Sequence, residues 1–305
     1  MSTTILPDHR ARTAYFGGLA ANRPVTDVIA DQLSPLTSTG AKALARCGRY
    51  SIGSAPIQLL RRSKGRVYAR GVKWCASRYC PTCQPRIMAS LAWKRAERAR
   101  AAKAAGYGIS FYSVDVPDCG PGELHAQLDL LLETFRATLP APSRLPVTWV
   151  RAGLSDLIGA DWNVEIDWNA DTGEWHPHIH ALVYRQSAWT PDALAFLNAQ
   201  WPWAALTDAQ EAELPEAAAR YSVKAENPKP HLLSLFDLAR LGLTDQVGEY
   251  LMAVQGRHLR SSSRKLGSLL GLQGDPEDAD LLQELDRMEG DSLGQLTLSE
   301  WRRAW

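Results

Sequence analysis

The sequence has no apolar run that approaches the roughly 18 to 20 residues needed to cross a bilayer, and no apolar segment typical of a signal peptide at its N-terminus. Both absences favour a cytoplasmic protein with no membrane partner. Cysteine is scarce as well, with five among 305 residues. Four of them lie between positions 47 and 83. In a cytosolic chain, such a concentration indicates metal binding more often than disulfide bonds.

The net charge is also small, at +1, but the charged residues are unevenly distributed along the chain. Residues 42–103 contain sixteen lysines and arginines against one acidic residue, Glu97. After Gly274, nine acidic residues face three arginines. A basic surface that only contacts solvent is the alternative. A bias sustained over about sixty residues nevertheless favours a nucleic-acid-binding region, followed by an acidic tail.

The cysteines are spaced as metal ligands. The segment WCASRYCPTC places four and then two residues between Cys75, Cys80 and Cys83. Structural zinc is held by four soft ligands in a tetrahedron, and Cys47 is the obvious fourth. A redox pair formed by Cys80 and Cys83, or simply buried thiols, is the alternative, but a redox pair leaves Cys75 without a role. We therefore predict a four-cysteine zinc site and expect Cys119, in a turn, to be an unpartnered thiol.

Periodicity predicts a mixture of helices and strands. Residues 1–40 show little of it and are interpreted as a flexible arm. Strands are expected at 65–73, 109–116 and 147–154. Helices are expected at 86–105, 124–139, 191–200, 207–214, 215–224, 244–254 and 278–289.

Residues 162–184 are typical of a β-hairpin. Residues 162–168 alternate apolar and polar, 169–174 are rich in turn formers, and the segment WHPHIHALVY follows. On a strand, His178 and His180 share one face and lie about 7 Å apart, so both can reach one cation. The first strand of the hairpin offers Glu165 or Asp167 as a third ligand. The register decides between them, and Glu165 is our preference. A polar stripe facing solvent is the alternative.

Two tyrosines follow on predicted helices. Tyr221 and Lys224 are three residues apart and therefore share one helix face. Tyr250 is the competing candidate for a nucleophile, and simple packing is the alternative for both tyrosines. Residues 256–265 are basic and rich in serine, which suits contacts with phosphates.

The order of RYCPTC, a basic helix, a strand, HPHIH and RYSVK resembles the rolling-circle plasmid replication initiators of the HUH endonuclease superfamily. The resemblance covers roughly residues 47–265, and its most specific feature is WHPHIH combined with RYSVK. It implies an α+β fold in which a central antiparallel sheet flanked by helices carries the histidines, and a facing helix carries the tyrosine. We expect a flexible arm (1–40), a basic zinc-binding element and helix (41–105), a nuclease domain (106–265) and an acidic tail (266–305).

The resemblance also implies a chemistry. His178, His180 and Glu165 would bind Mg²⁺ or Mn²⁺, and Tyr221 would nick single-stranded or hairpin origin DNA, leaving a 5′-phosphotyrosine and a 3′-hydroxyl primer. Lys224 would stabilise the phosphate or the phenolate. A host helicase and polymerase are further candidate partners. Some relatives have a glutamate one helical turn before the tyrosine, but here Ala217 occupies that position and Glu216 is one residue away. The residue for a second cleavage is therefore not assigned.

Two other classes of protein share these sequence features. One is an HUH transposase or relaxase, which performs the same chemistry on a different DNA target. The other is a non-enzymatic zinc-containing nucleic-acid-binding protein, in which the histidines have no chemical role.

Overall fold

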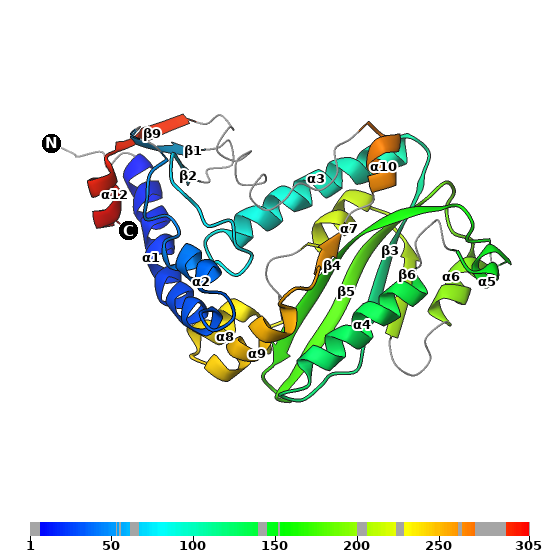
Figure 1. Ribbon diagram of the computed structural model, residues 1–305. Coiled ribbons are helices and arrows are strands. Elements are labelled where there is room, and N and C mark those ends of the chain that lie inside the picture. The colour runs from blue at the N-terminus through cyan, green and yellow to red at the C-terminus, as the bar shows by residue number, and fades with distance from the viewer. Residues whose placement is uncertain are drawn as a thin grey trace. The chain divides into compact units, whose positions relative to one another are not determined.

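A computed structural model describes residues 7–52, 54, 56–61, 67–139, 145–151, 153–199, 206–223, 229–261, 264–271 and 291–304 (Figure 1). The chain forms α-helices and antiparallel sheets, which confirms the predicted α+β class. It divides into two compact units. The terminal unit contains the described residues of Met1–Ile87, Ala239–Thr244 and Glu277–Trp305, and the central unit those of Met88–Leu238 and Asp245–Pro276. The sequence predicts four successive segments instead, and the difference arises because both chain ends belong to one unit.

The central unit is built on a six-stranded sheet with the order β6-β3-β5-β4-β7, and β8 also pairs with β4. Every pairing in it is antiparallel. The longest strands, β4 and β5, form the predicted hairpin. Strand β5 lies between β3 and β4. The strands are β3 (Gly108–Asp115), β4 (Leu157–Asn169), β5 (Glu174–Arg185), β6 (Leu206–Glu211), β7 (Leu232–Leu233) and β8 (Arg260–Ser261).

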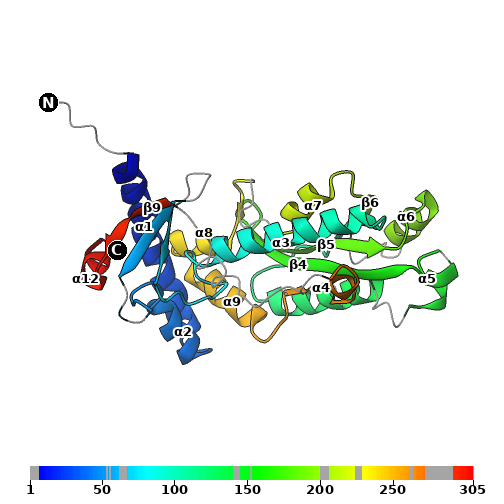
Figure 2. The same ribbon diagram turned by 90° about the horizontal axis from the view of Figure 1, so that it is seen from above.

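Helices cover both faces of this sheet (Figure 2). Small residues of α3, among them Ala99 and Ala102, pack with Leu182 and Tyr184 of β5 and with Ala219 of α7. The opposite face is covered by α4, whose Phe135 contacts Trp162 of β4. The helices that carry described residues of this unit are α3 (Gln84–Ala104), α4 (Leu124–Thr138), α5 (Val147–Arg151), α6 (Pro191–Asn198), α7 (Pro215–Tyr221), α8 (Leu235–Arg240), α9 (Thr244–Val254) and α10 (Arg264–Leu269). Helix α3 belongs to the central unit from Met88 onward, and α8 and α9 also cross unit boundaries.

Most of the predicted elements are present, with ends that differ by a few residues. Two predictions in the central unit are wrong. Residues 147–151 form helix α5 and not a strand. Residues 206–211 form strand β6 and not a helix, because they pair with residues 110–115 at the outer edge of β3, and sheet hydrogen bonds outweigh a weak local preference.

The flexible arm predicted for residues 1–40 is also wrong for the residues described. The chain forms a 27-residue helix, α1 (Pro7–Leu33), followed by α2 (Ser38–Ala45). Val25, Ile29 and Leu33 are buried and recur at every fourth position, which gives the helix an apolar stripe. The helix is difficult to predict from the sequence because it contains Pro24, and proline within a helix usually interrupts it.

A small three-stranded sheet joins the two ends of the chain within the terminal unit. Strand β1 (Ile57–Arg61) pairs with β2 (Val67–Arg70) on one side and with β9 (Asp291–Leu296) on the other. Helix α12 (Leu298–Ala304) follows, and its Trp301 is completely buried. The indole Nε1 of Trp301 donates to the carbonyl of Gly48 at 2.7 Å.

The acidic tail predicted for residues 266–305 is not a separate segment at residues 291–304, because their strand pairing and the buried Trp301 place them in the terminal unit. Helix α10, at the start of that predicted tail, belongs to the central unit, where its Leu266 is buried against α3. The predicted helix at 278–289 lies outside the described residues. No helix within the described ranges combines the length and apolar character needed to span a bilayer.

We expect Trp301→Ala to destabilise the terminal unit by about 3–5 kcal/mol, because it removes a fully buried aromatic side chain and its hydrogen bond. Urea unfolding followed by circular dichroism measures the loss. Ser299→Ala, at an exposed position of the same helix, is the control. Equal unfolding midpoints for the two variants would contradict the structural role given to Trp301.

Candidate metal centres

The strand register gathers histidines and carboxylates on one face of the sheet. In β5, His178 lies opposite Glu165 of β4 and opposite Asp115 of β3. His180 lies opposite Asn163 of β4 and Ser113 of β3. Directly paired residues of antiparallel strands project to the same face. The predicted choice of Glu165 therefore agrees with the register, while Asp167 pairs with His176, one step further along.

His178, His180 and Glu165 form a compact group. The Nε2 atom of His178 lies 3.2 Å from Oε2 of Glu165, and Nε2 of His180 lies 4.0 Å from the same oxygen. The two histidines are only 5% and 7% exposed. Ligands about 2.1 Å from a shared cation lie roughly 3 Å apart, so small side-chain shifts fit this group to one divalent ion. The group could hold a metal ion.

Neighbouring atoms orient both imidazole rings. The Nδ1 atom of His180 lies 3.2 Å from the hydroxyl of Ser113, and Nδ1 of His178 lies 3.4 Å from the carbonyl oxygen of His176. These contacts turn both Nε2 atoms toward Glu165, an arrangement typical of metal-binding histidines. Burial alone would lower the pKa of His178, but the hydrogen bond and charge of Glu165 outweigh it and raise that pKa. A cation bound here therefore replaces a proton.

A second group adjoins the first and was missed in the sequence. Asp115, His176 and His178 also bring their ligand atoms within 4.8 Å of one another. His176 is held by Asp118, whose Oδ1 lies 2.7 Å from its Nδ1. Asp115 lies in the strand predicted at 109–116, but the sequence does not show that this strand lies beside the histidines. The strand order was the missing information.

Tyr221 lies beside this histidine group. It is the last residue of α7, and its ring centroid lies 5.1 Å from that of His180 and 5.7 Å from that of Phe111. The residue is 48% exposed. Ala219, buried in the core, anchors its helix. The structure therefore brings Tyr221 together with the predicted ligands, whereas Lys224 lies outside the described residues.

The competing tyrosine is placed elsewhere. The ring of Tyr250, on α9, packs 6.4 Å from that of Trp175. Trp175 and the histidines His176, His178 and His180 differ by odd steps along β5, so their side chains point to opposite faces of the sheet. Tyr250 is therefore not a member of the histidine group.

The four predicted cysteines meet in the terminal unit. Their sulfur atoms are separated by 3.4 Å (Cys47 and Cys83), 3.6 Å (Cys80 and Cys47) and 3.7 Å (Cys75 and Cys83). Four sulfurs held about 2.3 Å from one ion in a tetrahedron lie about 3.8 Å apart. All four residues are free cysteines, and the cluster could hold a metal ion.

The surroundings of the cysteine cluster favour an ion. Hydrogen bonds with Cys75 and Cys80, together with burial, raise the pKa of the Cys47 thiol, so the thiolate form that binds metal requires a cation beside the sulfurs. Backbone amides also point at the sulfurs, since Cys75 N–H donates to Cys47 Sγ and Ser77 N–H donates to Cys75 Sγ, both at 3.5 Å. Cys119 is a free, buried cysteine, as predicted, and burial raises its pKa to about 12, so it stays a neutral thiol.

The basic helix α3 does not offer all its charge to a partner. Arg95 and Arg98 are buried, with exposed fractions of 0% and 2%. Arg98 pairs with the buried Asp161 at 2.7 Å, and the hydroxyl of Tyr184 donates to the other oxygen of that carboxylate at 2.8 Å. Arg95 donates to the carbonyl oxygens of Trp162 and Ser261. These arginines attach α3 to the face of the sheet that carries the histidines.

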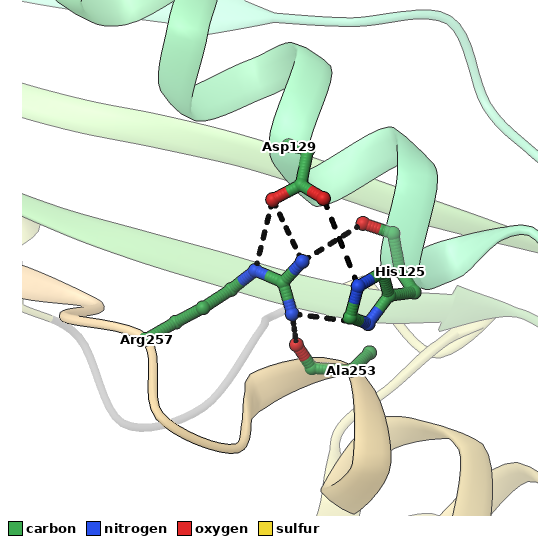
Figure 3. A network of polar contacts seen from close by, with 4 residues as sticks. All are labelled: His125, Asp129, Ala253 and Arg257. Carbon is green, nitrogen blue, oxygen red and sulfur yellow. Dashed lines mark hydrogen bonds and ion pairs between the residues drawn. The ribbon is translucent and has the colours of Figure 1, made fainter.

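Arg257, in the basic segment expected to contact phosphates, also has an internal role (Figure 3). Its guanidinium group pairs with Asp129 of α4 at 2.7 Å and donates to the carbonyl oxygens of His125 and Ala253. The expected role in phosphate binding is therefore wrong for this residue, because its side chain joins α4 to the end of α9.

No family model matches the chain, and searches of curated proteins and of solved structures likewise give no match. The geometry of the two centres therefore carries the functional interpretation.

We expect His180→Ala to weaken binding of Mn²⁺ at least about 10-fold, because it removes one of three converging ligands. Electron paramagnetic resonance of free Mn²⁺ during a titration measures the affinity. His125→Ala, at an exposed histidine on α4, should bind as the unaltered protein does. Equal affinity in both variants would exclude the histidine group as the cation site.

We expect the purified chain to retain one tightly bound metal ion at the cysteine cluster, and Cys83→Ser to lose it. Elemental analysis after dialysis measures the metal content per chain. Cys119→Ser, which removes a buried cysteine of the central unit, should keep the ion. Retention of the metal by Cys83→Ser would show that the cluster is not its site.

Proposed function

We propose that the protein is a metal-dependent single-strand DNA endonuclease and strand transferase that uses Tyr221 as its nucleophile, as rolling-circle replication initiators of the HUH superfamily do. One observation carries the proposal. A half-exposed tyrosine lies 5.1 Å, ring to ring, from a buried histidine that converges with a second histidine and a glutamate. A phenol beside a divalent cation is equipped to attack a phosphodiester.

The reaction follows from these residues. The Tyr221 oxygen attacks phosphorus and loses its proton to solvent, the bond from phosphorus to the 3′ oxygen breaks, and that oxygen takes up a proton. The products are a 5′-phosphotyrosine and a free 3′-hydroxyl. Because a phenol has a pKa of about 10, the attack needs assistance at neutral pH. A cation held by His178, His180 and Glu165 would supply it by polarising the phosphate. The new phosphoester keeps the bond energy, so the strand can be rejoined without a nucleotide cofactor.

The ligands suggest the identity of the two ions. Two imidazoles and a carboxylate suit Mn²⁺, and Mg²⁺ is the alternative. We assign the cysteine cluster to zinc in a structural role, because four thiolates complete a tetrahedron and leave no position for a substrate. Lys224 would neutralise the phosphate, as the sequence motif suggests. Glu216 pairs with Arg100 at 3.1 Å, so its carboxylate already has a partner on α3.

The two helices over the histidine face support an unpaired substrate. Arg100 pairs with Glu216, and Lys103 donates to the carbonyl of Glu213, so α3 and α7 run antiparallel. Trp93 lies two turns before Arg100 on α3, and Tyr221 lies five residues after Glu216 on α7. Because the two helices are antiparallel, Trp93 and Tyr221 lie toward the same end of the helix pair. Trp93 is 53% exposed. Exposed aromatic side chains stack with the bases of single strands, and duplex DNA does not offer its bases in this way.

The target DNA distinguishes this proposal from a transposase or relaxase, since the chemistry is shared. We propose single-stranded or hairpin origin DNA as the substrate, with a host helicase and polymerase acting on the nicked product. A non-enzymatic zinc protein would give no reason for burying two histidines and a glutamate beside an exposed tyrosine.

We expect Tyr221→Phe to abolish formation of an SDS-stable protein–DNA adduct, with a loss of more than about 1,000-fold, because no other oxygen replaces the nucleophile. The assay incubates the protein with Mn²⁺ and fluorescent single strands that tile the replicon encoding it, then resolves adducts on denaturing gels. Tyr250→Phe is the matched control and should form the adduct normally. An adduct that persists in Tyr221→Phe would contradict the assignment of the nucleophile.

A further inference from the structure

Basic side chains gather next to the cysteine cluster, around the residues that follow helix α2. Five exposed residues form what we call the basic patch: Arg46, Arg49, Tyr50, Lys73 and Arg302. They come from three segments of the terminal unit, and hydrogen bonds join those segments. The amide of Gly48 donates to the carbonyl of Lys73 at 3.0 Å, and the amide of Lys73 donates to the carbonyl of Tyr50 at 2.8 Å.

Arg302 completes the patch from the other end of the chain. Its Nε atom donates to the carbonyl of Arg49 at 3.0 Å, and its guanidinium lies 5.1 Å from the centre of the Tyr50 ring. Tyr50 is 42% exposed. Glu300, one turn before the end of the same helix, directs its carboxylate to the amide and hydroxyl of Thr297 at 2.7 Å. Its charge is thus engaged at the start of α12.

Two anchors hold the backbone of the patch. Cys47 and Cys75 belong to the cysteine cluster. Cys47 directly precedes Gly48, and Cys75 lies two residues after Lys73. On the other side, the buried indole of Trp301 donates to the carbonyl of Gly48. Four like charges placed together on a fixed backbone repel one another, and a partner with fixed negative charges removes that cost. A rigid backbone also reduces the entropy lost when the partner binds.

The composition of the patch suggests phosphates as the partner. Three of its four cations are arginines, whose planar guanidinium binds phosphate oxygens in pairs. Arg302 lies over one face of the Tyr50 ring, so a guanidinium group occupies one of the two positions where an unpaired base could stack. Contacts with phosphates alone suit the regular backbone of a duplex.

We propose that the basic patch is a second DNA-binding surface, which holds the phosphate backbone of duplex DNA independently of the histidine group. It would bind without regard to sequence through its charges and depend on the cysteine cluster for its shape. The proposal does not require that Tyr221 cleaves DNA, and goes beyond the nicking reaction in giving the terminal unit a function of its own.

Fluorescence anisotropy with a labelled 20-base-pair duplex tests the proposal on the full chain. We expect R49Q/K73Q to raise the Kd about 10-fold or more and to reduce the slope of log Kd against log salt by about 2, since two phosphate contacts are lost. The control R136Q/R151Q removes the same charge from exposed positions of the central unit and should bind as the unaltered protein does. Equal affinities for the two double variants would overturn the proposal.

Further arms separate the remaining outcomes. Tyr221→Phe should bind the duplex normally, and R49Q/K73Q should still form the covalent adduct with single strands, so failure of the nicking reaction and failure of the patch are distinguishable. Vesicles containing about 30% phosphatidylserine test a membrane surface as the partner. If R49Q/K73Q loses vesicle binding while keeping its affinity for the duplex, the patch binds membranes and the DNA proposal is wrong.

A measurement on the unaltered protein avoids any dependence on variant folding. Lysines are acetylated briefly with and without duplex DNA, and mass spectrometry compares the rates at each position. We expect several-fold protection of Lys73 and none of Lys103, an exposed lysine on α3 in the central unit. Equal acetylation of Lys73 in both conditions would overturn the proposal.

Discussion

The register of three antiparallel strands is the constraint on which the candidate site depends. Strand β5 carries its histidines at every second position, and β3 and β4 bring Asp115 and Glu165 opposite His178. A slip of one residue between β4 and β5 would send Glu165 to the face covered by α4 and remove one of the two carboxylates that lie opposite His178. The long β4–β5 hairpin, whose residues alternate between core and site, fixes this register. The other contributors to the site, Ser113 and Tyr221, are placed relative to the same strands.

The same face of the sheet combines two environments along β5. Toward Tyr184, the small residues of α3 and the Arg98–Asp161 pair close the face against solvent. Toward His178, a carboxylate and imidazoles replace the apolar contacts, and α7 ends at Tyr221. The transition occurs within a few residues of one strand. The position of α7, and of its tyrosine, is tied to α3 by the packing of Ala219 against the small residues of α3 and by the surface ion pair of Arg100 with Glu216.

Much of the site could be predicted because its signals are local. Alternation and turn residues predict the β4–β5 hairpin, and cysteine spacing predicts the cysteine cluster. Tertiary contacts decided the rest. Pairing with β3 makes a strand of residues 206–211, and pairing with β1 gives residues 291–296 a fixed place. Local composition contains neither fact.

Charge was the least reliable guide, because the sequence does not tell an exposed cation from a buried one. Arg95 and Arg98 count toward the basic bias of residues 42–103, yet both are buried against β4. Asp161, the residue that explains the burial of Arg98, lies 63 positions away along the chain. Asp115 was missed because its place beside His178 follows from the strand order, which the sequence does not show.

The central claim is that a divalent cation bound by His178, His180 and Glu165 lies next to Tyr221. Incorporation of 3-fluorotyrosine and fluorine NMR test it directly, with the resonances of residues 221 and 250 assigned by their Tyr→Phe variants. Paramagnetic broadening falls with the sixth power of distance, so a stoichiometric amount of Mn²⁺ should broaden the resonance of Tyr221 far more than that of Tyr250. Equal broadening of both resonances, or stronger broadening of Tyr250, would contradict the account.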